Sequence, residues 1–293
     1  MIPIPDPGGE IMNTTIMVTE STGPLEKEII KQIHKTGNCV KIAAIDTTEA
    51  SLTAGECPVA FLDLADPGTY QRALIDVKSV FLGLPMNHPG LQDLLLPFIE
   101  TARIYGVEHI VGMGTMGETD DSPLLIAERC MQNCGISYTI IRPNIYMQHF
   151  REITCEGVRR DSTIYLPAGG AKISLVDFRD IAEAVAKILL NGQHSNRIYF
   201  FTGAQALDPY AIAAILSTIT GKKIIYEPVN HNREWKILLG RGWKAVDIEL
   251  AIGLYEIARH GWCERVSTDL EKVLGREPVL FEQFARDFRD EWC

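Results

Sequence analysis

The sequence lacks any apolar run of about 18 residues, the length that a membrane-spanning helix needs. It also lacks a basic run: its 38 acidic residues outnumber its 28 lysines and arginines, for a formal net charge of −10. We therefore expect no nucleic acid and no membrane as partners, since both favour basic surfaces. The start of the chain has no signal-peptide pattern, and its three prolines and two glycines predict a flexible leader over residues 1–13 of a cytoplasmic protein.

Motifs that identify several enzyme classes are missing as well. No paired CxxC, HExxH or carboxylate–histidine spacing indicates a metal site, so we expect no metal. No GxSxG elbow indicates a serine hydrolase. The seven cysteines are scattered and odd in number, which predicts free thiols in a reducing compartment rather than a disulfide framework.

What is present is an alternation of short β-branched runs with helical stretches, typical of a parallel sheet with crossover helices. The pattern predicts strands at 15–19, 40–45, 59–62, 79–84, 109–113 and 138–141, and helices at 24–35, 68–75, 90–105 and 123–134. After Arg142-Pro143 it becomes more helical, with a strand expected at 173–176. We predict a Rossmann-like α/β fold, with helices on both faces of a parallel sheet. The core would span 14–143, and a smaller C-terminal substrate lobe, 144–293, would pack on it as part of one continuous unit.

Six segments in order resemble the NmrA-like, atypical short-chain dehydrogenase/reductase family, including its ergot-alkaloid-type reductases. They are 16–23, 62–67, 106–111, 134–144, 176–182 and 274–278, the last followed by 281–292. The resemblance implies a dinucleotide-binding fold. It also implies two alternative functions. One is an NAD(P)H-dependent reductase, and the other is a non-catalytic regulator, as in the NmrA branch of the family.

The glycine-rich loop departs from the family pattern. A dinucleotide fingerprint needs glycine at three points, for the tight turn, for approach of the pyrophosphate and for helix packing. Here Glu20 stands at the first point, Gly23 at the second and Glu26 at the third. Two carboxylates where a phosphate would arrive predict weak binding of NADH or NADPH, or none, with Gly23, Asp46 and Asp63 as vestigial cofactor contacts.

Other family positions also differ. Gly114 matches the place of a serine that helps hold the reacting carbonyl, and Leu124 the place of a lysine, while Glu128 keeps the usual acidic residue. An arginine that favours a 2′-phosphate often follows the second strand, where this chain has Ile45 and Asp46. Asp46 would instead accept from a ribose 2′-hydroxyl, which suits NAD better than NADP.

The carboxyl edge of the sheet is expected to form a pocket. We assign catalytic roles to His88, Thr115 and Tyr146, although each also has a structural interpretation as a loop, capping or core residue. Side chains expected to line the pocket for an apolar substrate are Met86, Met113, Asn144, Met147, Phe150 and Trp235.

Because pocket motifs persist while the hydride machinery is degraded, we predict a cofactor-independent cyclase or isomerase of a hydrophobic secondary metabolite. The first alternative is an NAD(P)H-dependent reductase of an imine, enone or quinone-like substrate. The second is a non-catalytic NmrA-like regulator that binds a partner protein. A homodimer is left open.

Overall fold

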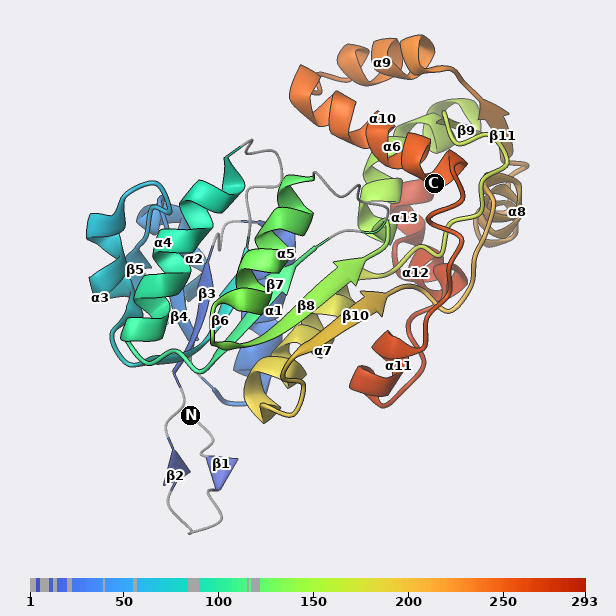
Figure 1. Cartoon of the computed structure of the whole chain (residues 1–293). Coiled ribbons are helices and arrows are strands. Elements are labelled where there is room, and N and C mark those ends of the chain that lie inside the picture. The colour runs from blue at the N-terminus through green and yellow to red at the C-terminus, as the bar shows by residue number, and fades with distance from the viewer. Residues whose placement is uncertain are drawn as a thin grey trace. The chain divides into compact units, whose positions relative to one another are not determined.

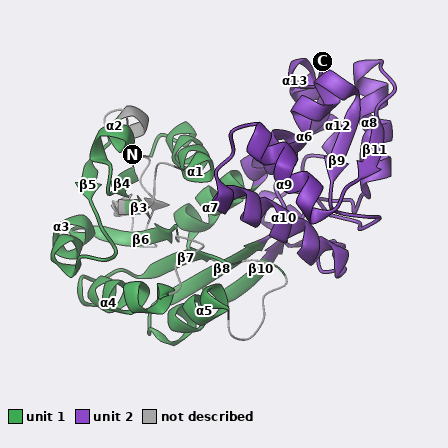
Figure 2. Ribbon diagram, turned by 90° about the horizontal axis from the view of Figure 1, so that it is seen from above, with its two compact units in different colours: residues 1–142, 181–199 green, residues 143–180, 200–293 purple. Residues whose placement is uncertain are grey.

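The computed structural model describes residues 4–5, 11–12, 15–19, 23–38, 40–54, 57–83, 90–114, 116 and 122–293. The chain divides into two compact units, which Figure 2 colours separately. Unit 1 comprises residues 1–142 and 181–199, and unit 2 comprises residues 143–180 and 200–293.

A seven-stranded sheet forms the centre of unit 1 and runs on into the first residues of unit 2. Its order is β10-β8-β7-β6-β3-β4-β5, from β3 (Thr15–Thr19), β4 (Val40–Ala44), β5 (Val59–Phe61), β6 (Val77–Leu82), β7 (His109–Met113), β8 (Ser137–Pro143) and β10 (Arg197–Phe201). The five pairs from β8 to β5 are all parallel. This confirms the Rossmann-like α/β prediction. The middle strand β6 is apolar and buried through Val80, Phe81 and Leu82, as a strand covered on both faces should be.

Helices cover both faces of this sheet (Figure 1). One face packs against α3 (Tyr70–Leu74), α4 (Leu91–Ile104) and α5 (Pro123–Asn133) in a single apolar cluster. On the other side lie α1 (Pro24–Lys35) and α7 (Phe178–Asn191) (Figures 1 and 2). Gly106 and Gly135 follow α4 and α5 with φ of 79° and 78°, the left-handed conformation that ends many helices.

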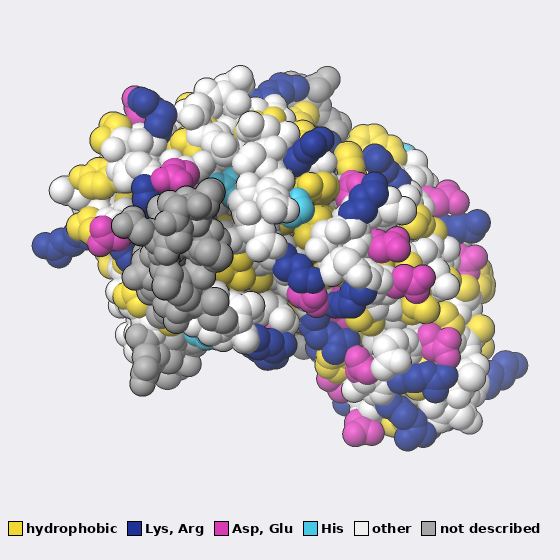
Figure 3. Space-filling view, turned by 90° about the horizontal axis from the view of Figure 1, so that it is seen from below, with side chains coloured by type: hydrophobic (Ala, Val, Ile, Leu, Met, Phe, Trp, Pro, Cys, Tyr) yellow, Lys and Arg dark blue, Asp and Glu magenta, His cyan; other side chains and the backbone are white. Residues whose placement is uncertain are grey.

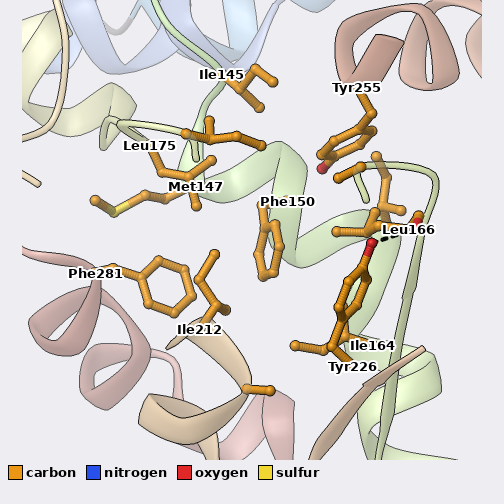
Figure 4. Close-up of a cluster of buried hydrophobic side chains, with 14 of the residues drawn as sticks. Ile145, Met147, Phe150, Ile164, Leu166, Leu175, Ile212, Tyr226, Tyr255 and Phe281 are labelled. Atoms are coloured by element: carbon orange, nitrogen blue, oxygen red, sulfur yellow. Dashed lines mark hydrogen bonds between the residues drawn. The ribbon is translucent and has the colours of Figure 1, made fainter. Parts of the chain in front are cut away.

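Unit 2 has its own apolar core (Figure 4). Its elements are α6 (Met147–Asp161), β9 (Thr163–Leu166), α8 (Pro209–Thr220), β11 (Ile225–Pro228), α9 (His231–Gly240), α10 (Ala245–Arg259), α11 (Asp269–Leu274), α12 (Phe281–Asp287) and α13 (Arg289–Trp292). Strands β9 and β11 pair in parallel. Phe150 of α6 and Phe281 of α12 meet edge to face, with ring centroids 5.5 Å apart.

Several local features differ from the sequence prediction. Helix α2 (Thr47–Ala54), strand β9 and helix α11 were not expected, and β1 (Ile4–Pro5) pairs with β2 (Ile11–Met12) in the stretch predicted as a leader. Residues 173–176 form isolated bridges rather than a strand. Cys57 is disulfide-bonded, so the expectation of free thiols is wrong there, because scattered positions in sequence can still meet in space.

In the described part of the chain, no helix is both long and apolar enough to cross a membrane. On the face in Figure 3, side chains of both charges are interspersed among the described residues.

Candidate functional site

The strand order of unit 1 places a switch point between β3 and β6. From β3 the chain continues to β4 and β5 on one side and then crosses to β6 on the other. In open α/β sheets, ligands bind outside the carboxyl ends of the strands at such a point. The buried Thr19 joins the two strand ends here: its hydroxyl lies 3.3 Å from the Phe81 carbonyl oxygen and accepts from the Gly83 amide at 3.0 Å.

Helix α1 begins close after β3 and presents its N-terminus beside this switch point. Gly23 is the N-cap residue, with φ −69° and ψ 155°, and Pro24 follows as the first helical residue. As a glycine, this N-cap residue has no side chain to bond the first-turn amides. A helix N-terminus carries partial positive charge and backbone amides that suit a phosphate.

Of the two carboxylates expected to repel a cofactor, Glu26 lies in the first turn of α1. An acidic side chain in that turn interacts favourably with the positive end of its own helix. Glu26 therefore has a structural role that does not require it to face a phosphate. Glu20 lies outside the described residues.

The other two predicted cofactor contacts follow the next strands of the same sheet. Asp46 comes after β4 and caps α2, since its Oδ1 accepts from the amides of Thr48 at 3.0 Å and Glu49 at 2.9 Å. Asp63 follows β5, and its Oδ1 accepts from the Ala65 amide at 2.8 Å. Gly23, Asp46 and Asp63 therefore follow three neighbouring strands, β3, β4 and β5, in one unit.

At the end of β7, the missing serine has a steric cause. A Cβ on Gly114 would lie 2.0 Å from Glu128 Oε1 and 3.3 Å from Arg142 Cγ. Glu128 on α5 is buried, and Arg142 on β8 holds it with Nε donating to Oε1 at 2.9 Å and Nη2 to Oε2 at 2.5 Å. The carboxylate of Glu128 thus fills the space that a side chain at position 114 would need. Met113, the last residue of β7, is 7% exposed.

In unit 2, the predicted substrate residues are mostly buried in the structure. Asn144 donates to Ser174 Oγ at 2.6 Å and to the Cys263 carbonyl at 2.8 Å, while its Oδ1 accepts from Ile145. Met147 and Phe150 belong to the apolar core (Figure 4). Trp235 on α9 packs at the margin of that core and stacks on His231, with centroids 6.3 Å apart.

Tyr146 is half-buried and forms the N-cap residue of α6, and its backbone bridges to Val176. His149, one turn further along, was not singled out from the sequence. Its Nε2 is buried with no hydrogen-bond partner among the described residues, and burial lowers its pKa to about 4. Its ring meets that of Trp243 at 6.4 Å.

Three predicted residues, Met86, His88 and Thr115, lie outside the described part of the chain, and their roles stay predictions. Within the described ranges, no group of three or more histidine, cysteine, aspartate or glutamate side chains could hold a metal ion. The described geometry of unit 1 fits a dinucleotide: it has a switch point, a helix N-terminus with glycine at its N-cap and an acidic residue after the second strand.

Comparison with known proteins gives a consistent result. The model of the NmrA-like family matches residues 124–278. The chain is 28% identical to the NAD(P)H azoreductase of Xenophilus azovorans, covering 92% of this chain and 96% of that protein. It is 27% identical to agroclavine dehydrogenase of Claviceps purpurea, covering 95% and 98%. The crystal structure of Citrobacter sp. triphenylmethane reductase complexed with NADP(H) superposes with a TM-score of 0.83 at 25% identity, covering 92% and 98%.

These similarities overturn two expectations. The predicted cofactor-independent cyclase or isomerase is wrong, because the matched proteins are reductases and dehydrogenases. The expectation of no cofactor is wrong as well, because a structural neighbour holds NADP(H) on the same fold. A count of glycines misleads at this loop, because Gly23 still stands at the N-cap of α1 although Glu20 and Glu26 occupy the other two glycine positions.

Proposed function

Since this chain belongs to the NmrA-like family, we propose that it is an NAD(P)H-dependent oxidoreductase that reduces an imine, enone or quinone-like substrate. The observation that carries the proposal is the N-terminus of α1, which has glycine at its N-cap and follows β3 at the β3–β6 switch point. Similarity to an azoreductase and a dehydrogenase over nearly the whole chain supports the same reaction class.

The described residues fit a nicotinamide dinucleotide. The first-turn amides of α1 that follow Pro24, which itself has no N–H, would hold the pyrophosphate. Gly23 would let the backbone approach it because glycine has no side chain. Asp46 would accept a hydrogen bond from the adenosine ribose. When bound, the cofactor supplies the hydride.

Reduction of a carbonyl, azo or imine group also needs a proton at the heteroatom. We assign this donation to the hydroxyl of Tyr146, which follows the carboxyl end of β8 in the sequence. Met113, at the carboxyl end of β7, would contact the apolar part of the substrate.

The first test is direct. Purified protein is titrated with NADH and NADPH by calorimetry, and cofactor oxidation is followed with an azo dye, a triphenylmethane dye, a quinone and a cyclic imine. We expect micromolar binding of at least one cofactor and substrate-dependent oxidation. Absence of binding by both cofactors at millimolar concentration would refute the proposal.

A second test addresses the proton donor. Tyr146→Phe should lower kcat by roughly a hundredfold. The dissociation constant of the cofactor should stay unchanged, because the phenol is assigned no cofactor contact. Unchanged kcat would remove Tyr146 from the mechanism while leaving the reductase proposal in place.

A further inference from the structure

Resting on the proposed function, we propose that this chain selects NADH over NADPH, and that the residues after β4 make the selection. In a dinucleotide fold the adenosine ribose lies at the end of the second strand, which is β4 here. The two residues that follow β4 are Ile45, 58% exposed, and Asp46, also exposed. Neither can bind a 2′-phosphate.

The carboxylate of Asp46 is fixed in place. Its Oδ1 accepts from the amides of Thr48 and Glu49 at 3.0 and 2.9 Å, so its orientation is set by the start of α2. Both bonds use one oxygen, which leaves Oδ2 able to accept from a ribose 2′-hydroxyl. A 2′-phosphate offers no such donor and carries negative charge towards the same carboxylate.

A lysine in the described part of this region is already engaged in an ion pair. Lys27 of α1 forms an ion pair with Glu49 of α2, with Nζ 2.9 Å from Oε1. Asp46, Glu49 and Lys27 together carry a net charge of −1, from two carboxylates and one ammonium. NADP sites place an arginine near the 2′-phosphate, and this group supplies a net negative charge instead.

We expect NADH to bind at least roughly tenfold more tightly than NADPH, measured by calorimetry on the full chain. Two substitutions should shift that ratio. Ile45→Arg introduces a cation and should tighten NADPH binding with little effect on NADH. Asp46→Asn removes the negative charge but keeps the helix cap, since asparagine also caps helices well, and should likewise favour NADPH.

Ile104→Arg is the matched control, because Ile104 is an exposed isoleucine on α4, 70% accessible. It should leave the ratio unchanged. Tighter binding of NADPH than NADH by the unaltered chain would overturn this inference while upholding the proposed function. A ratio that neither Ile45→Arg nor Asp46→Asn changes would overturn the assignment to this segment. Failure of both cofactors to bind would refute the proposed function, and the inference with it.

Discussion

Glu234 on α9 is buried against the core of unit 2, with 1% of its surface exposed. Neither of its carboxylate oxygens has a hydrogen-bond partner among the described residues, and the same holds for the hydroxyl of Tyr255 on α10. Burial raises the pKa of Glu234 from 4.5 to about 7, an effect that the nearby Arg241 only partly offsets. An ionised carboxylate in this position is costly, because nothing described there replaces its hydration.

We expect this residue to make stability fall as pH rises. Below pH 4.5 Glu234 is protonated in both the folded and the unfolded chain, and it contributes no pH dependence. Between 4.5 and about 7 the unfolded chain releases the proton while the folded chain retains it, so the free energy of unfolding falls. The loss reaches roughly 3 kcal/mol above pH 7, at 1.36 kcal/mol for each unit of pKa shift.

Urea unfolding of Glu234→Gln at pH 5 and pH 8 tests this. The variant should lack the part of the pH dependence that Glu234 contributes, because a neutral amide does not titrate. Glu249→Gln, an exposed carboxyl on α10, is the control and should unfold like the unaltered chain. Equal pH dependence in Glu234→Gln and the unaltered protein would contradict the assignment.

Gly114 gives a second prediction at this scale. Because its Cβ would meet Glu128 Oε1 at 2.0 Å, Gly114→Ala should lower the free energy of unfolding by roughly 1–3 kcal/mol. Gly170→Ala is the control, since no atom lies within 4 Å of its added Cβ. When Glu128 is also replaced by alanine, Gly114→Ala should lower the free energy of unfolding by less than it does in the unaltered chain. Additive effects would show that Glu128 is not the obstacle.

Among the elements, Asp180 binds the segment before α12, and both belong to unit 2. Its buried carboxylate accepts from Arg276 Nη2 at 2.6 Å and from the Val279 amide at 2.6 Å. Two of the family-like segments, 176–182 and 274–278, thus meet through one carboxylate. Their resemblance to the family has a structural explanation in this contact.

Removing that carboxylate should therefore destabilise unit 2. We expect Asp180→Ala to cost about 1–3 kcal/mol, because the Val279 amide loses its acceptor while the half-exposed Arg276 can be hydrated. Asp290→Ala on α13, where the carboxylate is exposed, should cost under 0.5 kcal/mol. Guanidinium unfolding followed by tryptophan fluorescence measures both, and similar values for the two variants would contradict the role of Asp180.

The strands of the sheet could be predicted well from sequence and some other elements could not. Strand β6, for example, ends in the apolar run of Val80, Phe81 and Leu82, and the helix α4 follows it in the sequence. Helix α2, by contrast, has small and polar residues without a helical apolar period. Residues 173–176 alternate like a strand, but their amides donate to three separate segments: Ile173 to Leu207, Ser174 to Cys263 and Val176 to Ile145. Sequence periodicity indicates that a backbone is extended. It does not show whether its hydrogen bonds go to one neighbouring strand or to several separate segments.

The candidate site was predictable in outline and not in detail. Asp46 and Gly23 were found because general dinucleotide rules assign their positions. The space that Glu128 takes at Gly114, and the orphaned nitrogen of His149, depend on contacts between residues distant in sequence. The cofactor expectation is wrong at the scale of the whole molecule, because a degenerate loop sequence does not by itself show that the fold has lost its cofactor.

Substitution of Gly23 tests whether the N-terminus of α1 holds the cofactor. Its φ of −69° and ψ of 155° are accessible to any residue, so Gly23→Ala should change the stability of the cofactor-free protein by at most about 1 kcal/mol. The added methyl group would stand where the backbone approaches the pyrophosphate.

At a hundred times its dissociation constant, a cofactor stabilises the folded state by about 2.7 kcal/mol, which corresponds to a rise in Tm of several degrees. We expect that rise with the unaltered chain and with Gly170→Ala, and little or none with Gly23→Ala at the same cofactor concentration. If Gly23→Ala shows the full rise, the end of α1 does not hold the cofactor, and the site lies elsewhere in the fold.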